Sequence, residues 1–119
     1  MYKRPARLLV AALTDDGRAG VVARLARTWE VAQWLEVRAA ESMHGLRRTD
    51  LEWADLLVAV DGEAARAVPE DRPETCRVKR WHLPAAGALS LEVAAASALN
   101  CVAGGMRMLA RLDAEGGGA

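Results

Sequence analysis

The residues with the clearest chemical potential lie in a polar segment that follows the first long apolar run of the chain. They are consecutive, and their types are those of a loop that leads into a helix. Backbone N–H groups at the start of a helix, together with an arginine, can bind a phosphate-like anion. The candidate anion-binding residues are Thr14, Asp15, Asp16, Gly17, Arg18 and Ala19.

Two carboxylates in this loop oppose such binding and leave other roles open. Asp15 and Asp16 would repel an anion, or one of them could accept the loop N–H groups in its place. Alternatively, one aspartate caps the helix while Arg18 pairs with a neighbouring side chain. A third possibility is that the adjacent carboxylates help to hold Mg²⁺. The sequence alone does not choose among these roles, and we assign no metal ligands.

Composition restricts the classes of partner. The 119 residues contain 16 basic and 16 acidic side chains, so bulk charge does not favour nucleic acid or an anionic membrane. The two cysteines, Cys76 and Cys101, are too few and too far apart for a disulfide framework or a metal cluster. The apolar run 8–13 is shorter than the apolar core of a signal peptide. We therefore expect a cytoplasmic protein without nucleic-acid, membrane or cofactor partners.

Hydrophobic patterning predicts four strands that alternate with helices. The runs 7–13 and 55–60 are almost continuously apolar, as is typical of central parallel strands. The segments 35–40 and 77–83 carry more charge and suit positions nearer the sheet edges. Right-handed crossovers then give an α/β three-layer sandwich with a four-stranded parallel sheet and helices on both faces.

Helix signals lie between and after these strands. Apolar residues at helical spacing predict a first helix with one apolar face, formed by Val22, Leu25, Ala26 and Trp29. Cys101 falls within the apolar part of the last helix, and we expect it in the core. Residues 1–113 are predicted to form one domain, and residues 114–119 a disordered glycine-rich tail. The expected N-caps are Thr49 with Glu52 in a capping box, Asp61 for a helix at 63–68, and Ser90 for a helix to about Leu112.

Three segments, in this order, resemble the low-molecular-weight protein tyrosine phosphatases. Residues 8–20 look like that family's first strand and phosphate loop, in which a cysteine, five residues and an arginine precede a helix. Residues 51–61 resemble its supporting strand, and residues 81–87 lie where the family carries its acid loop. The resemblance implies a phosphatase I-like or flavodoxin-like sandwich. Phosphocarrier IIB domains of sugar phosphotransferase systems are similar in size and first loop, and they also require the cysteine.

The residues that carry the family's chemistry are absent. Covalent phosphoryl transfer needs a thiolate at the strand end and an acid for the leaving oxygen. The nucleophile position is Ala12, and the acid-loop positions are Ala85 and Ala86. Of the expected active-site residues only Arg18 matches, so no catalytic residue is assigned.

These observations predict a non-catalytic member of the family, acting as a binding or regulatory module with a vestigial phosphate loop. The expected partner is a phosphate-like anion or a protein, with Trp34 and Trp81 as candidate contact residues, and a homodimer is possible. Two alternatives stay open. One is an enzyme with a reshaped metal- or carboxylate-dependent hydrolase or transferase site; the other is a structural subunit of an assembly.

Overall fold

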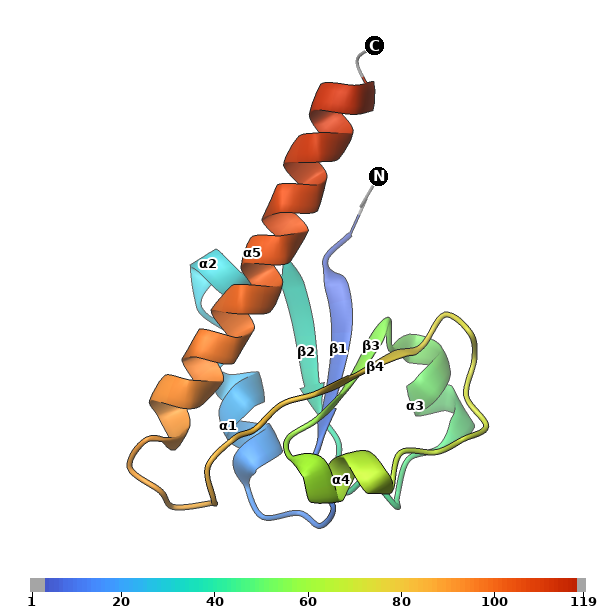
Figure 1. Ribbon diagram of the computed structural model, residues 1–119, viewed down its shortest axis with the longest axis vertical. Helices are drawn as coiled ribbons and strands as arrows, with labels where there is room; N and C mark the ends of the chain where they lie inside the picture. The colour runs from blue at the N-terminus through green and yellow to red at the C-terminus, as the bar shows by residue number, and fades with distance from the viewer. Residues whose placement is uncertain (1–3, 118–119) are drawn as a thin grey trace.

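A single parallel sheet organises the molecule. The computed structural model describes residues 4–117, with the side chains of all of these except Trp29 and residues 113–117. Four parallel strands lie in the order β2-β1-β3-β4 (Figure 1). The predicted α/β sandwich with a four-stranded parallel sheet is confirmed. The strands are β1 (Ala6–Ala11), β2 (Leu35–Ala39), β3 (Leu56–Ala59) and β4 (Arg77–Arg80).

The two apolar runs form the central strands because only there are both faces of a strand covered. Leu8 and Val10 of β1 are completely buried, as are Leu57 and Val58 of β3. The register pairs Leu8 with Leu56 across the two strands. All four residues of β4 are exposed, which agrees with its predicted edge position.

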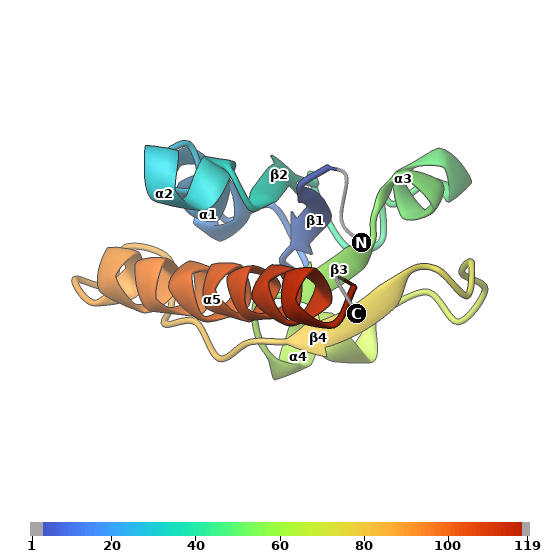
Figure 2. The same cartoon turned by 90° about the horizontal axis from the view of Figure 1, so that it is seen from above.

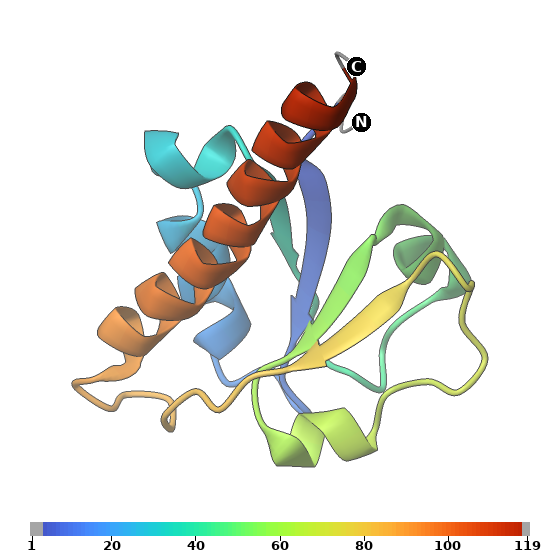
Figure 3. The same ribbon diagram turned by 45° about the horizontal axis from the view of Figure 1, so that its top comes forward.

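The helices cover the two faces of the sheet unequally. Figure 2 shows α1 (Arg18–Leu25), α2 (Trp29–Ala32) and α5 (Leu91–Gly117) on one side of the sheet and α3 (Arg48–Trp53) on the other. The short helix α4 (Gly62–Arg66) lies near the carboxyl ends of the strands (Figures 1 and 3). The face opposite α1 and α5 is therefore covered only in part.

The helix predicted to continue through Trp29 is interrupted. Helix α1 ends at Leu25, and Thr28 adopts an extended conformation that begins α2. The carbonyl oxygen of Thr28 accepts hydrogen bonds from the N–H groups of Val31 and Ala32. Threonine is a poorer helix former than most residues, and the extended backbone of Thr28, whose side chain makes no capping hydrogen bond, separates the two helices.

One predicted cap is wrong and another is confirmed. Helix α3 has Arg47, not Thr49, as its N-cap, and the Arg47 N–H donates to Asp50 Oδ2 at 2.8 Å. The reciprocal acid of the cap is thus Asp50, because it occupies the third helical position from which a side chain reaches the N-cap N–H. Asp61 caps α4 as predicted, with Oδ1 accepting from Ala64 N–H at 2.8 Å.

Helix α5 is longer than the sequence indicated. It continues to Gly117, so residues 114–117 are helical and differ from the expected disordered tail; residues 118 and 119 lie outside the described part. No proline follows Leu112 to stop the helix. Its second half projects beyond the sheet (Figures 1 and 3). By length and composition, Leu91–Leu112 is the one helix within residues 4–117 that could cross a membrane.

Two side chains are placed differently from expectation. Cys101 is exposed on α5 rather than buried in the core, whereas Cys76 is buried. Trp81 is only 5 % exposed, so it packs in the core and is not a contact residue at the surface. Trp34 is half-buried against the core.

Candidate functional site

The candidate site lies at the carboxyl ends of β1, β3 and β4. Backbone pairing continues past the strands: Val60 N–H donates to the Ala11 carbonyl at 3.1 Å, and Leu83 N–H to the Val60 carbonyl at 2.9 Å. These bonds hold the residues after each strand close together. The loop that contains Asp16 and Arg18 therefore meets Asp61 and Pro84 at one edge of the sheet.

Arg18 is the centre of this site. It is only 8 % exposed, and it is the one charged residue among the described residues that is classed as buried. Its Nε donates to Asp16 Oδ2 at 2.8 Å, and its Nη2 lies 2.8 Å from Asp61 Oδ2. Nη1 points to the Pro84 carbonyl oxygen at 3.4 Å. The guanidinium is thus already shared between two carboxylates and a carbonyl.

The second oxygen of each carboxylate binds the backbone. Asp16 Oδ1 accepts the N–H of Arg18 at 3.1 Å, and Asp61 Oδ1 accepts the N–H of Ala64. Between Asp16 and Arg18 stands Gly17, with φ of 93°. This left-handed conformation, which favours glycine, turns the chain so that Asp16 reaches back to the first turn of α1. The first turn of α1 is therefore bound by a side chain of its own loop.

The pKa values of Asp61 and Arg18 favour their charged forms. The hydrogen bond from Ala64 N–H, followed by the hydrogen bond and charge of Arg18, lowers the pKa of Asp61. Burial disfavours the charged form of Arg18, but hydrogen bonds to Asp61 and Asp16 outweigh it and raise the pKa of Arg18. Asp61 and Arg18 are therefore both charged at neutral pH, and short N–O contacts join Arg18 to Asp61 and Asp16; we call these three side chains the Arg18 cluster.

The structure brings only part of the predicted loop together. Asp16 and Arg18 belong to the Arg18 cluster, Gly17 makes the turn between them, and Ala19 is buried. Thr14 and Asp15 are exposed. From the sequence, parallel strand order predicts that Asp61 and Pro84 gather with residues 14–18 at the carboxyl ends of the strands, and the structure confirms this placement. The sequence assigned Asp61 the role of a helix cap and did not specify its ion pair with Arg18.

The phosphatase resemblance implied a nucleophile position and two acid positions, which are occupied here by alanines. Ala12 follows β1 and is 2 % exposed, and its carbonyl oxygen accepts the N–H of Met43 at 2.8 Å. Ala85 and Ala86 are exposed in the segment before α5. His44 and His82 are also exposed, in different loops.

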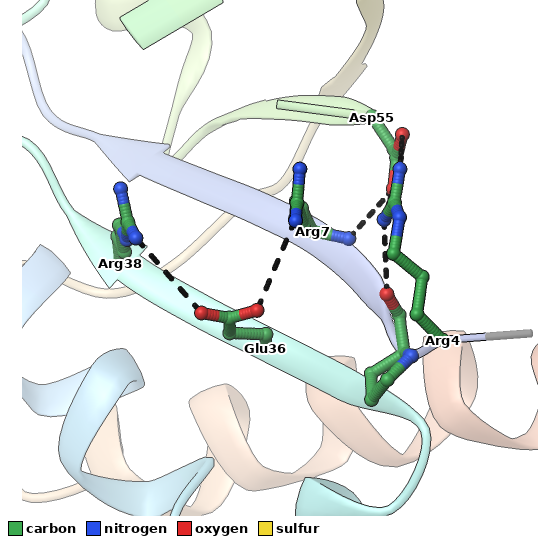
Figure 4. A network of polar contacts seen from close by, with 6 residues as sticks. Arg4, Arg7, Glu36, Arg38 and Asp55 are labelled. Atoms are coloured by element: carbon green, nitrogen blue, oxygen red, sulfur yellow. Dashed lines mark hydrogen bonds and ion pairs between the residues drawn. The ribbon is translucent and has the colours of Figure 1, made fainter. Parts of the chain in front are cut away.

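A second polar network begins at the opposite, amino ends of β1 and β3 and extends along β2 to Arg38 (Figure 4). Arg4 binds both oxygens of Asp55, at 2.7 and 3.1 Å, and the Arg7 N–H donates to Asp55 Oδ2 at 2.9 Å. The hydrogen bond from Arg4 is the main cause of the lowered pKa of Asp55. Glu36 lies 4.0 Å from both Arg7 and Arg38. These bonds join the chain before β1 to the start of β3, which is a structural role.

A cavity of about 480 Å³ opens on the α3 side of the sheet. Arg38 at its wall also stacks over the Trp53 ring, 4.1 Å from the ring centre. Its lining contains none of the three side chains of the Arg18 cluster. The polar side chains that line it are Arg38, Glu41, Ser42, Arg47 and Asp50.

No group of three or more histidine, cysteine, aspartate or glutamate side chains that could hold a metal ion occurs among the described residues. Comparison of the chain with models of known protein families gave no match, and comparison with curated proteins gave none either.

Proposed function

We propose that the protein is a non-catalytic binding or regulatory module, similar to the low-molecular-weight phosphatases, whose vestigial phosphate loop is closed by its own carboxylates. The observation that carries the proposal is the position of Arg18. Its Nε and Nη2, the donors that an oxyanion would need, are bound to Asp16 and Asp61 at 2.8 Å.

A phosphate ion would have to displace these contacts before it could bind. Asp16 occupies both the guanidinium and the first N–H of α1, which are the two kinds of donor expected in a phosphate loop. Its carboxylate is covalently part of the loop, so it competes at a high effective concentration. Phosphate would also approach two negative charges. This arrangement favours a structural role for the loop.

The strand end supports the same proposal. Ala12 is buried at the nucleophile position, and a methyl group cannot attack phosphorus. Alanines 85 and 86 have no proton to give to a leaving group. A role in binding then falls to other surfaces of the molecule.

The proposal is tested by NMR titration with phosphate and then vanadate, following the backbone amides of residues 14–20. We expect no saturable shifts in the wild-type protein at millimolar anion. Asp16→Ala should free donors of Arg18 and give saturable shifts, which Arg18→Ala in the same background should remove. Asp15→Ala is the matched control, since that aspartate is exposed and adjacent.

Saturable shifts in the wild-type loop that are lost in Arg18→Ala would overturn the closed-loop proposal. Turnover of an aryl phosphate by the wild-type protein, abolished in Arg18→Ala, would overturn the non-catalytic assignment. The second assay is independent of the first, since binding and turnover are read separately.

A further inference from the structure

Strand β4 forms an open edge of the sheet. It pairs with β3 on one side, and β3 is the only element of the described chain that packs along it. Figure 2 shows β4 at the margin of the sheet. All four of its residues, Arg77–Arg80, are exposed. An edge strand presents unpaired backbone groups that a further strand can bind, so the sheet can be extended here.

The pairing of β4 with β3 uses alternate residues of β4. The Arg77 N–H donates to the Asp55 carbonyl oxygen at 3.1 Å, and the Trp81 N–H donates to the Ala59 carbonyl oxygen at 2.8 Å. Lys79 lies midway between these two donors in the same parallel register. Its N–H and C=O groups therefore also point toward β3.

Val78 and Arg80 are the residues of β4 that alternate with these. Neighbouring residues of a strand direct their N–H and C=O groups to opposite sides, so Val78 and Arg80 direct theirs to the open edge. Neither N–H donates to the backbone of another part of the described chain. A strand added at this edge would meet donors and acceptors in the repeat that a sheet requires.

Three of the four side chains of β4 are cationic. Arg77, Lys79 and Arg80 carry positive charge, although the chain as a whole has no excess of either sign. None of the three forms an ion pair with a side chain that the structure describes. Side chains alternate between the faces of a strand, so Arg77 and Lys79 lie on one face and Arg80 on the other. The edge therefore attracts negative charge on both faces of the sheet.

We propose that the open edge of β4 binds an extended acidic segment of a partner protein, which adds to the sheet as a further strand. Backbone hydrogen bonds of Val78 and Arg80 align the segment, and the three cations select its charge. This interaction goes beyond the closed phosphate loop and uses neither Asp16 nor Arg18. Either proposal can therefore fail without the other.

Charges on an edge strand also prevent it from pairing with a second copy of the same chain. Two β4 edges side by side would bring like charges together, which destabilises cross-strand pairs. The same charges do not oppose a strand that carries carboxylates at those positions. In addition, β4 contains no proline, which would have removed an outward N–H. The edge is therefore selective for charge and is not blocked.

A nucleic acid suits the edge less well than a peptide does. Phosphate groups accept hydrogen bonds, but they cannot donate to the outward carbonyl oxygens of Val78 and Arg80. Proteins that bind single strands also stack the bases on aromatic side chains, and β4 has none. A polypeptide satisfies the donors, the acceptors and the charge of this edge together.

The short length of β4 limits the affinity. Two outward-facing residues offer few backbone hydrogen bonds, and the cations are exposed to solvent, where salt screens their attraction. We therefore expect a transient complex, with a dissociation constant between about 10 μM and about 1 mM at low salt. The dissociation constant should rise as salt is added.

NMR titration with a synthetic peptide tests the edge. The probe is a capped peptide of alternating residues, Glu-Val-Glu-Val-Glu. The backbone amides of Val78 and Arg80 should shift saturably and gain protection from solvent exchange, whereas the amide of Lys79, which points to β3, should shift less. A peptide with lysine in place of glutamate should give no shifts, because its charge has the same sign as that of β4.

A modified peptide separates strand pairing from simple charge attraction. The same sequence methylated at every backbone nitrogen keeps its carboxylates but donates no backbone hydrogen bond. It should bind at least about tenfold more weakly than the unmodified peptide. Equal affinity of the two peptides would show that charge alone attracts them, and would overturn strand pairing.

Substitutions test the charge and the backbone separately. Arg80→Glu should weaken binding of the Glu-Val peptide at least about tenfold. Arg27→Glu is the matched control, because Arg27 is exposed and lies between α1 and α2. Val78→Pro removes an outward N–H without removing a bond to β3, so it should weaken binding by a similar factor. Val78→Thr keeps that N–H and should bind as wild type does, with circular dichroism as the check of folding for every variant.

Absence of saturable shifts at Val78 and Arg80 with the acidic peptide at about 1 mM would overturn the proposal. An equal loss of binding in Arg27→Glu and Arg80→Glu would overturn it as well, because the attraction would then not be local to β4. Tighter binding of a thymidine oligonucleotide than of the peptide, lost in Arg80→Glu, would assign the edge to single-stranded nucleic acid instead.

Discussion

The Nη2 atom of Arg18 lies 2.8 Å from Oδ2 of Asp61, so the first residue of α1 is tied to the residue that caps α4. The two residues are 43 positions apart in the chain. Their contact joins the loops that follow the two central strands. Because Asp61 also holds the first turn of α4, one ion pair fixes two helix starts at the carboxyl edge of the sheet.

This relationship predicts a large cost for removing Arg18. Arg18→Ala leaves the carboxylates of Asp16 and Asp61 without their cationic partner, and both are about three-quarters buried. Removing one partner of a fully buried ion pair costs about 3–5 kcal/mol, and these carboxylates are buried only in part. We therefore expect Arg18→Ala to lower the free energy of unfolding by about 2 kcal/mol, as measured by urea denaturation.

The control for this measurement is Arg24→Ala. Arg24 pairs with Glu92, but both side chains are more than half exposed, and exposed pairs contribute about 0.5 kcal/mol or less. Equal losses in the two variants would contradict a structural role for the Arg18 cluster.

Asp61 should make stability depend on acid pH. Its pKa in the folded protein is lower than the ordinary value of 3.8. The stabilisation is therefore complete above that ordinary value and is lost as the pH falls through the folded pKa. Asp61→Asn keeps a capping oxygen but does not titrate. The free energies of unfolding of wild type and variant should differ at pH 7 and converge as the pH falls below about 4.

The lowered pKa of Asp55 adds an acid-dependent loss of its own, but this contribution is common to both proteins and cancels in the difference. The comparison therefore isolates Asp61. A difference that stayed constant from pH 7 to the acid transition would show that Asp61 does not contribute through its charge.

The sheet could be predicted from sequence because its central strands carry an unambiguous signal. The apolar segments that became β1 and β3 are bounded by polar residues, and parallel order follows from the intervening helices. The edge position of β4 followed from its charges. The cap of α3 was predicted wrongly because Arg47 is not a favoured N-cap residue. Its N–H is bound instead by Asp50 at the third helical position.

Burial along α5 could not be predicted in the same way. Periodicity identifies a core face only when the opposite face is polar, and α5 is apolar on both. Cys101 was therefore expected in the core and is instead exposed. The Arg18 loop was found from its residue types, and parallel strand order places Asp61 at the same edge of the sheet. That Asp16 and Asp61 both bind the guanidinium depends on side-chain placement, which spacing along the chain does not encode.

Two glycines three residues apart should respond in opposite ways to the same substitution. Gly17 has φ of 93°, a conformation that a side chain makes unfavourable, so Gly17→Ala should cost about 1 kcal/mol and loosen the contact of Asp16 with α1. Gly20 lies within α1 without a positive φ, and an added Cβ meets nothing within 4 Å. Gly20→Ala should therefore be neutral or stabilise by up to about 1 kcal/mol. Thermal and urea unfolding of the two variants against wild type measures both effects, and a stabilising Gly17→Ala would show that the loop does not need its left-handed turn.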